Sequence, residues 1–509
     1  MTLEIVLIAL LTVYLAASFL LHLYGINAYI MIGLFLRTQR RRRREDRELL
    51  QRFYEDHGDA DLPVVTTQLP VFNERHVLER LVRAVCAFDY PREKHEIQIL
   101  DDSTDETREL AGRLAARLRA RGHDVRHIHR EDRTGFKAGA LAEGLRRARG
   151  EFVAVFDADF VPPADFLRRT IPFLLEDARC GFVQTRWGHR NRGFSALTFL
   201  QSVGIDGHFA VEQPARCWNG LFFNFNGTAG VWRRQAIDEA GGWEADTLTE
   251  DLDLSYRTQL AGWQPRYLLD VVTPAEIPTD INALKSQQYR WAKGSIQAAV
   301  KLLPVVWKRR DMGVFKRVQA TLHLTHYLVH PLILLITLLI LPLIFLFHVQ
   351  FTSVYVAPLI VGMFLALFGP STLYIFSQGV SGQRWPLLLL WLPAMMALGI
   401  GLAVNNTRAV LSGLSGRQSE FVRTPKLGQL AESKVRGVAG PLRSLYRQPV
   451  SRLFLVEIFM GLWALAAFLG GFHIIGAVAG PFLLVQAAGF TYVGIASVVH
   501  ERGGRKLGI

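Results

Sequence analysis

The sequence predicts an α/β domain with a Rossmann-like, mainly parallel sheet, together with an α-helical transmembrane region. Two observations predict this architecture. Between residues 62 and 283, short apolar runs alternate with helical patterns, which is typical of parallel strands joined by helices. Strongly apolar segments lie on both sides of that stretch. With 509 residues, 50% of them hydrophobic, the chain has room for two or three domains.

The first segment, residues 1–36, is predicted to be a transmembrane helix. Residues 5–36 contain no Lys, Arg, Asp or Glu, and about 20 apolar residues cross a bilayer. A secretory signal peptide is the alternative, but residues 1–4 lack the positive charge with which such peptides begin. The basic linker that follows, residues 37–62, contains five consecutive arginines, Arg40 to Arg44. The positive-inside rule places these arginines in the cytoplasm and the N-terminus outside.

The net charge indicates which macromolecules or surfaces the chain can bind. A net charge of +13 is typical of nucleic-acid binding in a soluble protein. Beside a membrane segment, arginines that face anionic lipid are the simpler explanation. We therefore expect a lipid bilayer, and no nucleic acid, as a partner.

The three cysteines, Cys86, Cys180 and Cys217, fit no zinc-site spacing and are odd in number, so reduced thiols in a cytosolic domain are expected.

A cytosolic domain is predicted over residues 63–284. Buried strands are expected at 64–71, 97–100, 125–128 and 152–156, with helices at 75–88, 106–120 and 137–148. Ligands of such sheets bind beyond the carboxyl ends of the strands. Asp101 and Asp102 follow the second strand directly, and Asp157 follows the fourth. We expect these carboxylates at the binding edge of the sheet.

The rest of the chain is predicted to form interface helices (285–320) and a transmembrane channel region (321–509). Apolar segments lie at 322–347, 354–376, 386–411, 453–469 and 474–499. Residues 412–452 carry eight Lys or Arg and two Glu, so they should be cytoplasmic. If the three preceding apolar segments all crossed the membrane, a chain that starts from a cytoplasmic domain would place residues 412–452 outside. The segment 386–411, interrupted by proline and glycine, is therefore predicted to lie at the cytoplasmic interface. Five spans remain, and the C-terminus lies inside.

Asp157 and Asp159 are candidate metal ligands, separated by one alanine. In extended chain, residues two apart point the same way, so the two carboxylates can hold Mg²⁺ or Mn²⁺. Such an ion would neutralise a diphosphate leaving group. A solvated turn is the alternative for this triplet.

Two segments are candidates for holding a nucleotide. Asp102 can accept hydrogen bonds from a ribose or a base if Thr104 or Asp105 caps the following helix instead, which leaves Asp102 free. The first strand ends in a segment that can hold a nucleobase, with a helix start as the alternative; its donor-binding candidates are Pro70, Phe72 and Glu74.

Two further segments are candidates for contacts with phosphate and sugar. Lys137 lies beside small residues at a helix N-terminus, a position that suits phosphate, although a solvated lysine is the alternative. In the sequence QQYRW, Gln287 and Arg290 are expected to bind diphosphate, and Trp291 offers a flat face for a sugar ring. An interfacial tryptophan with a lipid-facing arginine is the alternative.

The sequence TED contains the candidates for a general base, Asp251 and Glu250. A sugar hydroxyl is a poor nucleophile, so a carboxylate must take its proton during attack, which typically contributes about 10²- to 10⁴-fold. Capping of the helix that follows is the alternative.

Together, these segments resemble the processive family-2 glycosyltransferases, the cellulose-synthase-like group. The resemblance is closest to the plant-type mannan and glucan synthases and is carried by QLPVFNE (68–74), LDDSTD (100–105), GFKAGAL (135–141), FNGTAGVWR (225–233) and TEDLDLSYR (249–257). It implies a GT-A fold, with Asp251 as the base and metal coordinated at Asp159. The residues lining the site for the acceptor's terminal sugar would be Phe225, Asn226, Gly227 and Thr228.

The same resemblance implies a mobile gating loop over residues 417–428 that covers bound nucleotide. Its donor-binding residues would be Phe421, Thr424 and Lys426. Arg423 replaces a valine of the family pattern, and Phe72 stands where many members have tyrosine.

The sequence therefore predicts an inverting, processive glycosyltransferase that polymerises a β-linked polysaccharide and translocates it. The donor is expected to be GDP-mannose or UDP-glucose, and the product a β-1,4-mannan, a glucomannan or a β-glucan. The bacterial inner membrane is the expected location, and an accessory export subunit a possible partner. A non-processive enzyme that makes a lipid-linked sugar is one alternative. A transporter or scaffold with a degenerate transferase domain is the other.

Overall fold

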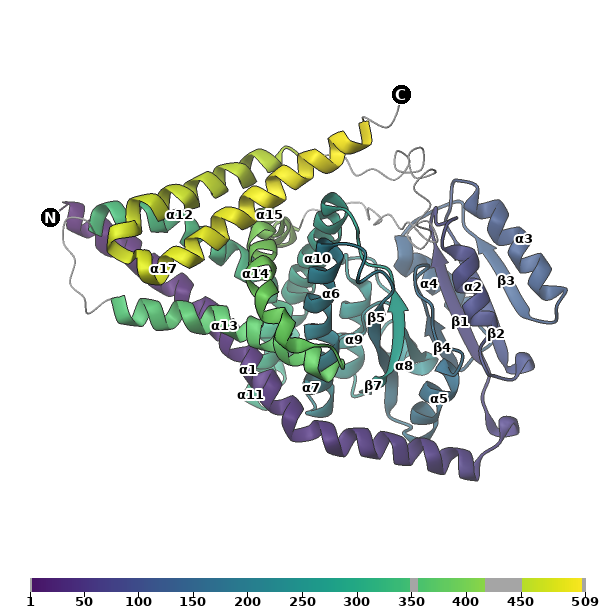
Figure 1. Cartoon of the computed structure of the whole chain (residues 1–509). Coiled ribbons are helices and arrows are strands. Elements are labelled where there is room, and N and C mark those ends of the chain that lie inside the picture. The colour runs from purple at the N-terminus through teal and green to yellow at the C-terminus, as the bar shows by residue number, and fades with distance from the viewer. Residues whose placement is uncertain (1, 348–355, 417–450, 506–509) are drawn as a thin grey trace.

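The computed structural model describes residues 2–347, 356–416 and 451–505. An α/β domain built around one sheet lies at one end, and a group of long apolar helices lies at the other (Figure 1). The helix α1, Thr2–Asp56, joins them: it starts among the apolar helices and runs along the base of the α/β domain. This arrangement confirms the predicted combination of a mainly parallel α/β fold with an apolar helical region.

The basic segment that follows the apolar part of α1 is helical. Residues 37–56, predicted as a linker, continue α1 without a break. Arginine and glutamate four residues apart favour a helix, and Arg41–Glu45 and Arg44–Glu48 lie at 3.5 Å and 3.4 Å. Arg43 also pairs with Asp270 at 2.6 Å. The arginine-rich turns are thereby tied to the α/β domain.

The sheet has seven strands in the order β3-β2-β1-β4-β6-β5-β7. Strands β1 to β4 run parallel, whereas β6 is antiparallel to both of its neighbours and β5 is parallel to β7. The strands are β1 Val65–Val71, β2 His95–Asp101, β3 Asp124–His129, β4 Phe152–Val155, β5 Cys180–His189, β6 Gly230–Arg233 and β7 Gln264–Ala275. The first four coincide closely with the strands expected from the sequence.

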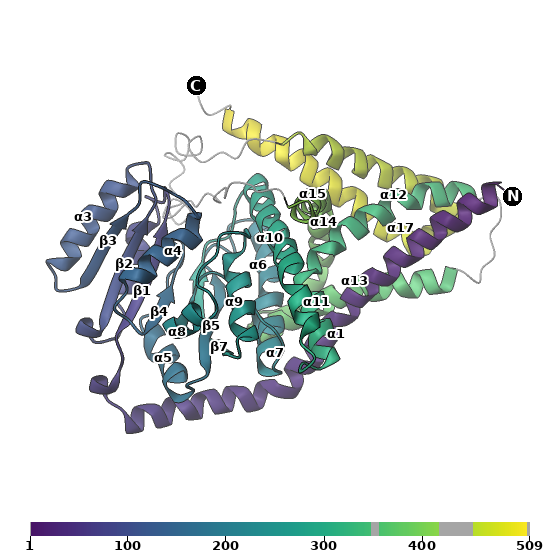
Figure 2. The same ribbon diagram turned by 180° about the vertical axis from the view of Figure 1, so that it is seen from behind.

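Helices cover both faces of the sheet because its central strand β4 is apolar on both sides. Along β4, Phe152 and Ala154 belong to one core, while Val153 and Val155 belong to the other. The first face is covered by α2 Leu78–Cys86, α3 Thr107–Arg119 and α5 Phe166–Glu176. The second is covered by α4 Phe136–Arg147, α7 Gln213–Trp218, α8 Arg234–Glu239 and α9 Glu250–Leu260. Figure 2 shows α4 and α9 from that side.

Two helices connect the α/β domain to the apolar region. They are α10 Ile281–Lys308 and α11 Val314–Leu324 (Figure 2). Asp280 begins α10 by accepting hydrogen bonds from the backbone N–H groups of Asn282 and Ala283, at 2.8 and 3.1 Å, which satisfies two of the free donors of the first turn. Between β5 and α7, the chain forms α6 Ala196–Asp206 and a π-helix, η3 Gly207–Glu212.

Five helical stretches in the described part of the chain are long and apolar enough to cross a membrane: Leu3–Asp56, His326–Leu346, Trp385–Leu414, Leu453–Gly471 and Gly480–Val499. The helices of this region are α12 Val329–Phe347, α13 Val356–Val380, η6 Trp385–Trp391, α14 Leu392–Gly401, α15 Ala403–Leu414 and α17 Leu453–Arg505. The stretch predicted as an interface helix, 386–411, is divided into η6, α14 and α15. Its position relative to a bilayer stays a prediction.

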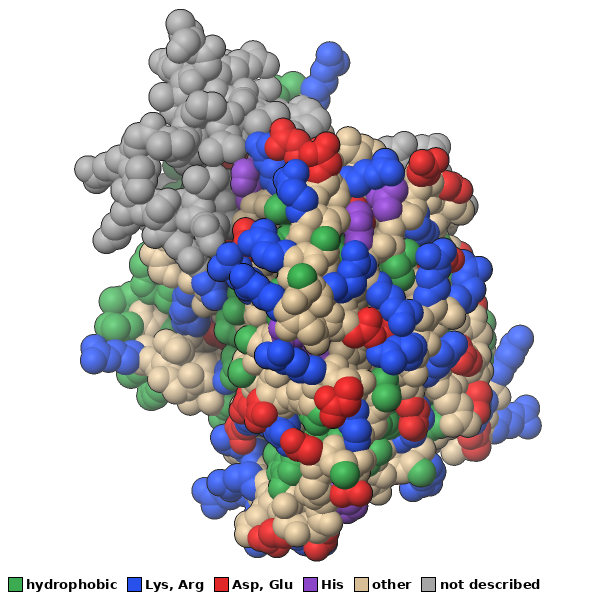
Figure 3. Space-filling model, turned by 90° about the vertical axis from the view of Figure 1, so that its right-hand side faces the viewer, with side chains coloured by type: hydrophobic (Ala, Val, Ile, Leu, Met, Phe, Trp, Pro, Cys, Tyr) green, Lys and Arg blue, Asp and Glu red, His purple; other side chains and the backbone are tan. Residues whose placement is uncertain are grey.

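Positive charge is not confined to the arginine run. Figure 3 shows Lys and Arg side chains spread over the face of the α/β domain farthest from the apolar helices, with Asp and Glu among them. Asp124 is paired with Arg149, and the buried Glu96 is paired with the half-exposed Arg126. The net charge of +13 is therefore distributed over the domain as well as along α1.

Candidate active site

A pocket of about 190 Å³ lies at the carboxyl ends of β1, β2 and β4, at the edge where ligands of such sheets bind. The first residues of α9 and the middle of α10 close its other side. Most of the residues singled out in the sequence line it: Pro70, Phe72, Glu74, Asp102, Lys137, Asp157, Asp159, Asn226, Gly227, Glu250, Asp251, Gln287, Arg290 and Trp291. Segments more than 200 residues apart in the chain, such as those of Pro70 and Trp291, thus meet around one space.

Lys137 is at the centre of the charged side of this pocket. Its Nζ donates to Asp157 Oδ1 at 2.6 Å and to the carbonyl of Gly227 at 2.8 Å, and lies 3.9 Å from Glu250 Oε1. Burial alone would lower the pKa of Lys137, but the carboxylates around it outweigh burial and raise the pKa. The ammonium is therefore charged and can neutralise phosphate.

Gly227 lets the pocket close tightly. Its φ of +75° favours glycine, and a Cβ at this position would lie 2.9 Å from Asp251 Oδ2 and 3.1 Å from Lys137 Nζ. The backbone at residue 227 therefore fills the place that a side chain would take. It contributes a carbonyl to Lys137 without blocking Asp251.

Glu250 is buried and Asp251 is half-buried in the first turn of α9. Burial, followed by the charge of Glu250, raises the pKa of Asp251 to about 7, although Lys137 opposes the shift. Burial also raises the pKa of Glu250, against the attraction of Lys137. A carboxylate with a pKa near neutrality is well suited to accept a proton from a hydroxyl.

The helix α10 positions Gln287, Arg290 and Trp291 against the same pocket. Burial lowers the pKa of Arg290 to about 10, although the neighbouring carboxylates favour its charged form. The close approach of α10 depends on Gly294, because a Cβ there would lie 2.5 Å from the side chain of Thr249. The residue before Glu250 and Asp251 is thus in direct contact with the helix that carries Arg290.

The opposite end of the pocket combines an aromatic ring with arginines. Arg133 stacks over the ring of Phe72 at 3.4 Å. Asp102, expected to be free, instead accepts two hydrogen bonds from Arg130, at 2.8 and 2.6 Å. Sequence reasoning missed Arg133 as a pocket residue and Arg130 as the partner of Asp102. Their positions in the segment HREDRTGFK, between β3 and α4, were the signal that could have found them.

Asp157 and Asp159 are suitable for a metal ion. Both line the pocket, and their carboxylate oxygens are the donors that Mg²⁺ and Mn²⁺ prefer. Asp157 is held in place by Thr228, whose Oγ accepts a hydrogen bond from the backbone N–H of Asp157 at 2.9 Å. The residues present therefore fit a hard divalent cation.

Some predicted site residues do not reach this space. Phe225 and Thr228 are fully buried and do not line the pocket, so they support its wall instead. The gating loop 417–428, with Phe421, Thr424 and Lys426, lies outside the described residues. Trp187, His189 and Glu276 line the pocket, although nothing in their sequence context distinguished them.

A second cavity of about 620 Å³ extends from the pocket between the apolar helices. The lining of the pocket and that of the cavity have seven residues in common: Trp187, Ile205, Asn226, Thr249, Asp251, Gln287 and Trp291. Farther along, polar and aromatic side chains come from helices distant in sequence: His22, Tyr24, His208, Glu212, His326, Tyr374 and Gln486. Asp251 and Trp291 therefore border both the pocket and the cavity among the apolar helices.

Comparison with known proteins agrees with this geometry. Residues 63–294 match the model of the family described as glycosyltransferase like family 2. Glucomannan 4-beta-mannosyltransferase 2 of Arabidopsis thaliana is 35% identical over 395 residues, which are 75% of this chain and 72% of that protein. The chain belongs to glycosyltransferase family 2. Glucomannan 4-beta-mannosyltransferase 1 of Cyamopsis tetragonoloba is 34% identical and covers 86% of the chain and 82% of its own length. The predicted family, its cellulose-synthase-like group and the enzyme class are thereby confirmed.

A solved structure, the mannosyltransferase PcManGT from Pyrobaculum calidifontis in complex with GDP-Man and Mn²⁺, aligns with 78% of this chain and 100% of its own, at 21% identity and a TM-score of 0.48. The apolar helices make the chain a membrane glycosyltransferase, and its relatives favour a β-linked polysaccharide as product over a lipid-linked sugar.

Proposed function

We propose that this glycosyltransferase transfers mannose from GDP-mannose, with inversion, to the end of a growing β-1,4-linked chain, and passes that chain through the apolar helices. One observation carries the proposal: Asp251 and Trp291 line both the donor pocket and the larger cavity. An acceptor held at Trp291 can therefore present its hydroxyl to Asp251 while the rest of the polymer extends away from the donor.

Donor binding relies on the charged side of the pocket. Asp157 and Asp159 would hold Mg²⁺ or Mn²⁺, which when bound supplies positive charge to the diphosphate. Lys137 and Arg290 supply further positive charge and stabilise the departing nucleoside diphosphate. Gln287 donates or accepts beside Arg290, and Phe72, Arg133 and Asp102 hold the nucleoside. Arginine donors and a carboxylate acceptor match the edge of guanine, and the named relatives are mannosyltransferases.

Asp251 accepts the proton of the acceptor hydroxyl as that hydroxyl attacks the anomeric carbon. Its carboxylate is available at neutral pH because its pKa is about 7. Glu250, held near Lys137, adjusts that pKa through its own charge. Attack from the side of Asp251, opposite the diphosphate, inverts the configuration and produces a β-linkage.

The experiment that tests this role compares Asp251→Asn with the unchanged chain in purified membranes. We expect polymer synthesis to fall by about 10²- to 10⁴-fold, the usual contribution of a general base, while binding of GDP is retained. A matched control is Asp246→Asn, an acidic residue of the preceding loop that pairs with Lys301 at 2.7 Å outside the pocket. An unchanged rate in Asp251→Asn would remove the assignment.

Donor and product are tested together. Membranes containing the enzyme are incubated with GDP-mannose, UDP-glucose and other nucleotide sugars, and the product is digested with linkage-specific hydrolases. We expect an insoluble product from GDP-mannose that a β-1,4-mannanase degrades. A product degraded only by a glucanase would overturn the donor assignment, and a solvent-extractable lipid would overturn processive synthesis.

We also propose that the α/β domain, the N-terminal arginines and the C-terminus lie on the cytoplasmic side. The basic residues of α1 support this orientation through the positive-inside rule. The named relatives are plant proteins, so they lend no support to the bacterial inner membrane. That location and the accessory export subunit remain predictions from the sequence alone.

A further inference from the structure

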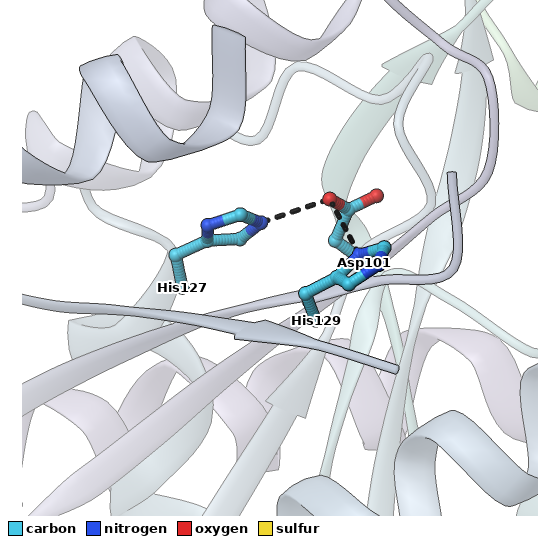
Figure 4. A group of neighbouring side chains, drawn as sticks. All are labelled: Asp101, His127 and His129. Carbon is cyan, nitrogen blue, oxygen red and sulfur yellow. Dashed lines mark hydrogen bonds and ion pairs between the residues drawn. The ribbon is translucent and has the colours of Figure 1, made fainter. Parts of the chain in front are cut away.

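Three potential metal ligands meet beside the donor pocket, outside the catalytic machinery. Asp101 is the last residue of β2, and His127 and His129 lie two residues apart on β3. Residues two apart on a strand point to the same face, and β2 pairs with β3 so that Asp101 lies opposite His129. Figure 4 shows the two imidazole rings on either side of the Asp101 carboxylate.

The distances between these groups are close to those of a metal site. Asp101 Oδ2 lies 2.8 Å from His127 Nε2 and 3.4 Å from His129 Nδ1. One ligand atom from each of the three residues lies within 4.8 Å of the other two. Ligands about 2.0–2.2 Å from a tetrahedral zinc ion are separated from one another by roughly 3.3 Å. The two separations that involve Asp101, 2.8 and 3.4 Å, lie on either side of that value.

The chemistry of the three groups also favours a metal. His129 Nδ1 is buried and makes no hydrogen bond within the described part of the chain. Asp101 Oδ1 accepts a hydrogen bond from the N–H of Ser103 at 2.9 Å.

We propose that Asp101, His127 and His129 bind a zinc ion, separate from the cation at Asp157 and Asp159. Two imidazole nitrogens and one carboxylate oxygen suit Zn²⁺, whereas oxygen-only sites suit Mg²⁺ and Mn²⁺. The imidazole side chains are 18% and 16% exposed, so the ion can enter from solvent and keep water as its fourth ligand. The zinc would also give His129 Nδ1, whose contact with Asp101 is 3.4 Å long and is no hydrogen bond, a direct bond.

The position of the site connects it to the donor pocket. The backbone N–H of Arg130 donates to the carbonyl of Asp101 at 3.0 Å, and the side chain of Arg130 holds Asp102. A zinc ion that joins the ends of β2 and β3 would therefore restrain the Arg130–Asp102 pair. The ion acts on donor affinity through this pair and takes no part in glycosyl transfer.

The test counts zinc directly. The purified full-length chain is stripped with EDTA, dialysed against zinc chloride and analysed for zinc by mass spectrometry, alongside His127→Gln, His129→Gln and the control His123→Gln, which changes a histidine just before β3. We expect the unchanged chain and His123→Gln to bind one zinc ion more per chain than the two ligand variants. Equal zinc in all four would overturn the proposal.

Zinc K-edge absorption on the unchanged chain at less than one equivalent provides a second measurement that requires no variant to fold. We expect two imidazole nitrogens and oxygen ligands around zinc. A shell of oxygens alone, or of three or more imidazoles, would contradict the assignment. Neither measurement depends on glycosyl transfer, so the zinc site and the proposed reaction can fail independently.

Discussion

At the scale of single residues, the pocket depends on groups whose charge is set by their neighbours. Asp251 and Glu250 lie near Lys137 and Arg290; burial and the charge of Glu250 raise the pKa of Asp251, and burial and the charge of Asp157 raise the pKa of Glu250. Their positions in the first turn of α9 would normally favour negative charge. Burial outweighs that effect. These two carboxyl groups therefore keep a proton at pH values at which an exposed carboxyl group, with a pKa near 4, has lost it.

The pH dependence of the rate follows from the pKa of Asp251. A general base must be deprotonated, so kcat/KM, which reports the free enzyme, should fall as the pH drops below about 7. We expect close to a tenfold fall per pH unit on that side. In Asp251→Asn, the residual rate should no longer follow this slope; persistence of the same slope would assign it to a different group.

The stability of the folded protein should also depend on Asp251, but it should fall as the pH rises. Because the folded state keeps Asp251 protonated up to about pH 7, whereas the unfolded chain releases the proton near pH 4, stability falls as the pH rises between these values. Thermal unfolding of the metal-free chain in detergent between pH 5 and 8 measures this. We expect Asp251→Asn to gain relative stability towards pH 8. Parallel curves for the two proteins would contradict the raised pKa.

At the scale of elements, α10 connects the reaction to the apolar helices. One stretch of this helix presents Gln287, Arg290 and Trp291 to the pocket, and Gly294 lies against Thr249. Leu248 is also held by Gln297, whose Oε1 accepts its N–H at 3.0 Å. These contacts fix the position of the TED segment (249–251) relative to the QQYRW segment (287–291).

The substitution Gly294→Ala tests the contact between α10 and the TED segment. The added methyl group would meet the Thr249 side chain at 2.5 Å, so α10 and the TED segment must move apart, at a cost of about 1–3 kcal/mol in folding free energy. We expect lower thermal stability and a lower kcat. Gly313→Ala is the matched control, since nothing lies within 4 Å of its Cβ position. Equal effects of the two substitutions would show that the contact is unimportant.

A buried ion pair provides a second connection between α10 and the apolar helices. Lys285 Nζ lies 2.6 Å from Glu457 Oε1 of α17, and both side chains are almost fully buried. Removing one partner leaves a buried charge uncompensated, which typically costs about 3–5 kcal/mol. We expect Lys285→Met and Glu457→Leu each to destabilise the protein in thermal unfolding, and the double variant to recover most of the loss. Additive losses would show that the two side chains act separately.

At the scale of the whole molecule, the sequence predicted the elements better than their contacts. The strands around Asp102 and Asp157 were predictable because short apolar runs and turn residues are local signals. The partners of those carboxylates were not, because Arg130 and Asp102 are 28 residues apart and meet only through the pairing of β2 with β3. The zinc ligands were overlooked for the same reason: no local pattern connects Asp101 to His127.

The long helix α1 has a consequence for how the molecule tolerates insertions. Fifty-five residues in one helix cover about 80 Å, and any added residue turns everything beyond it by about 100°. One alanine inserted at the boundary between lipid and water would swing Arg43 away from Asp270. Seven alanines, close to two full turns, would restore the orientation and merely lengthen the rod. The direction in which Arg43 points around the axis of α1, more than the length of the helix, thus decides whether Arg43 pairs with Asp270.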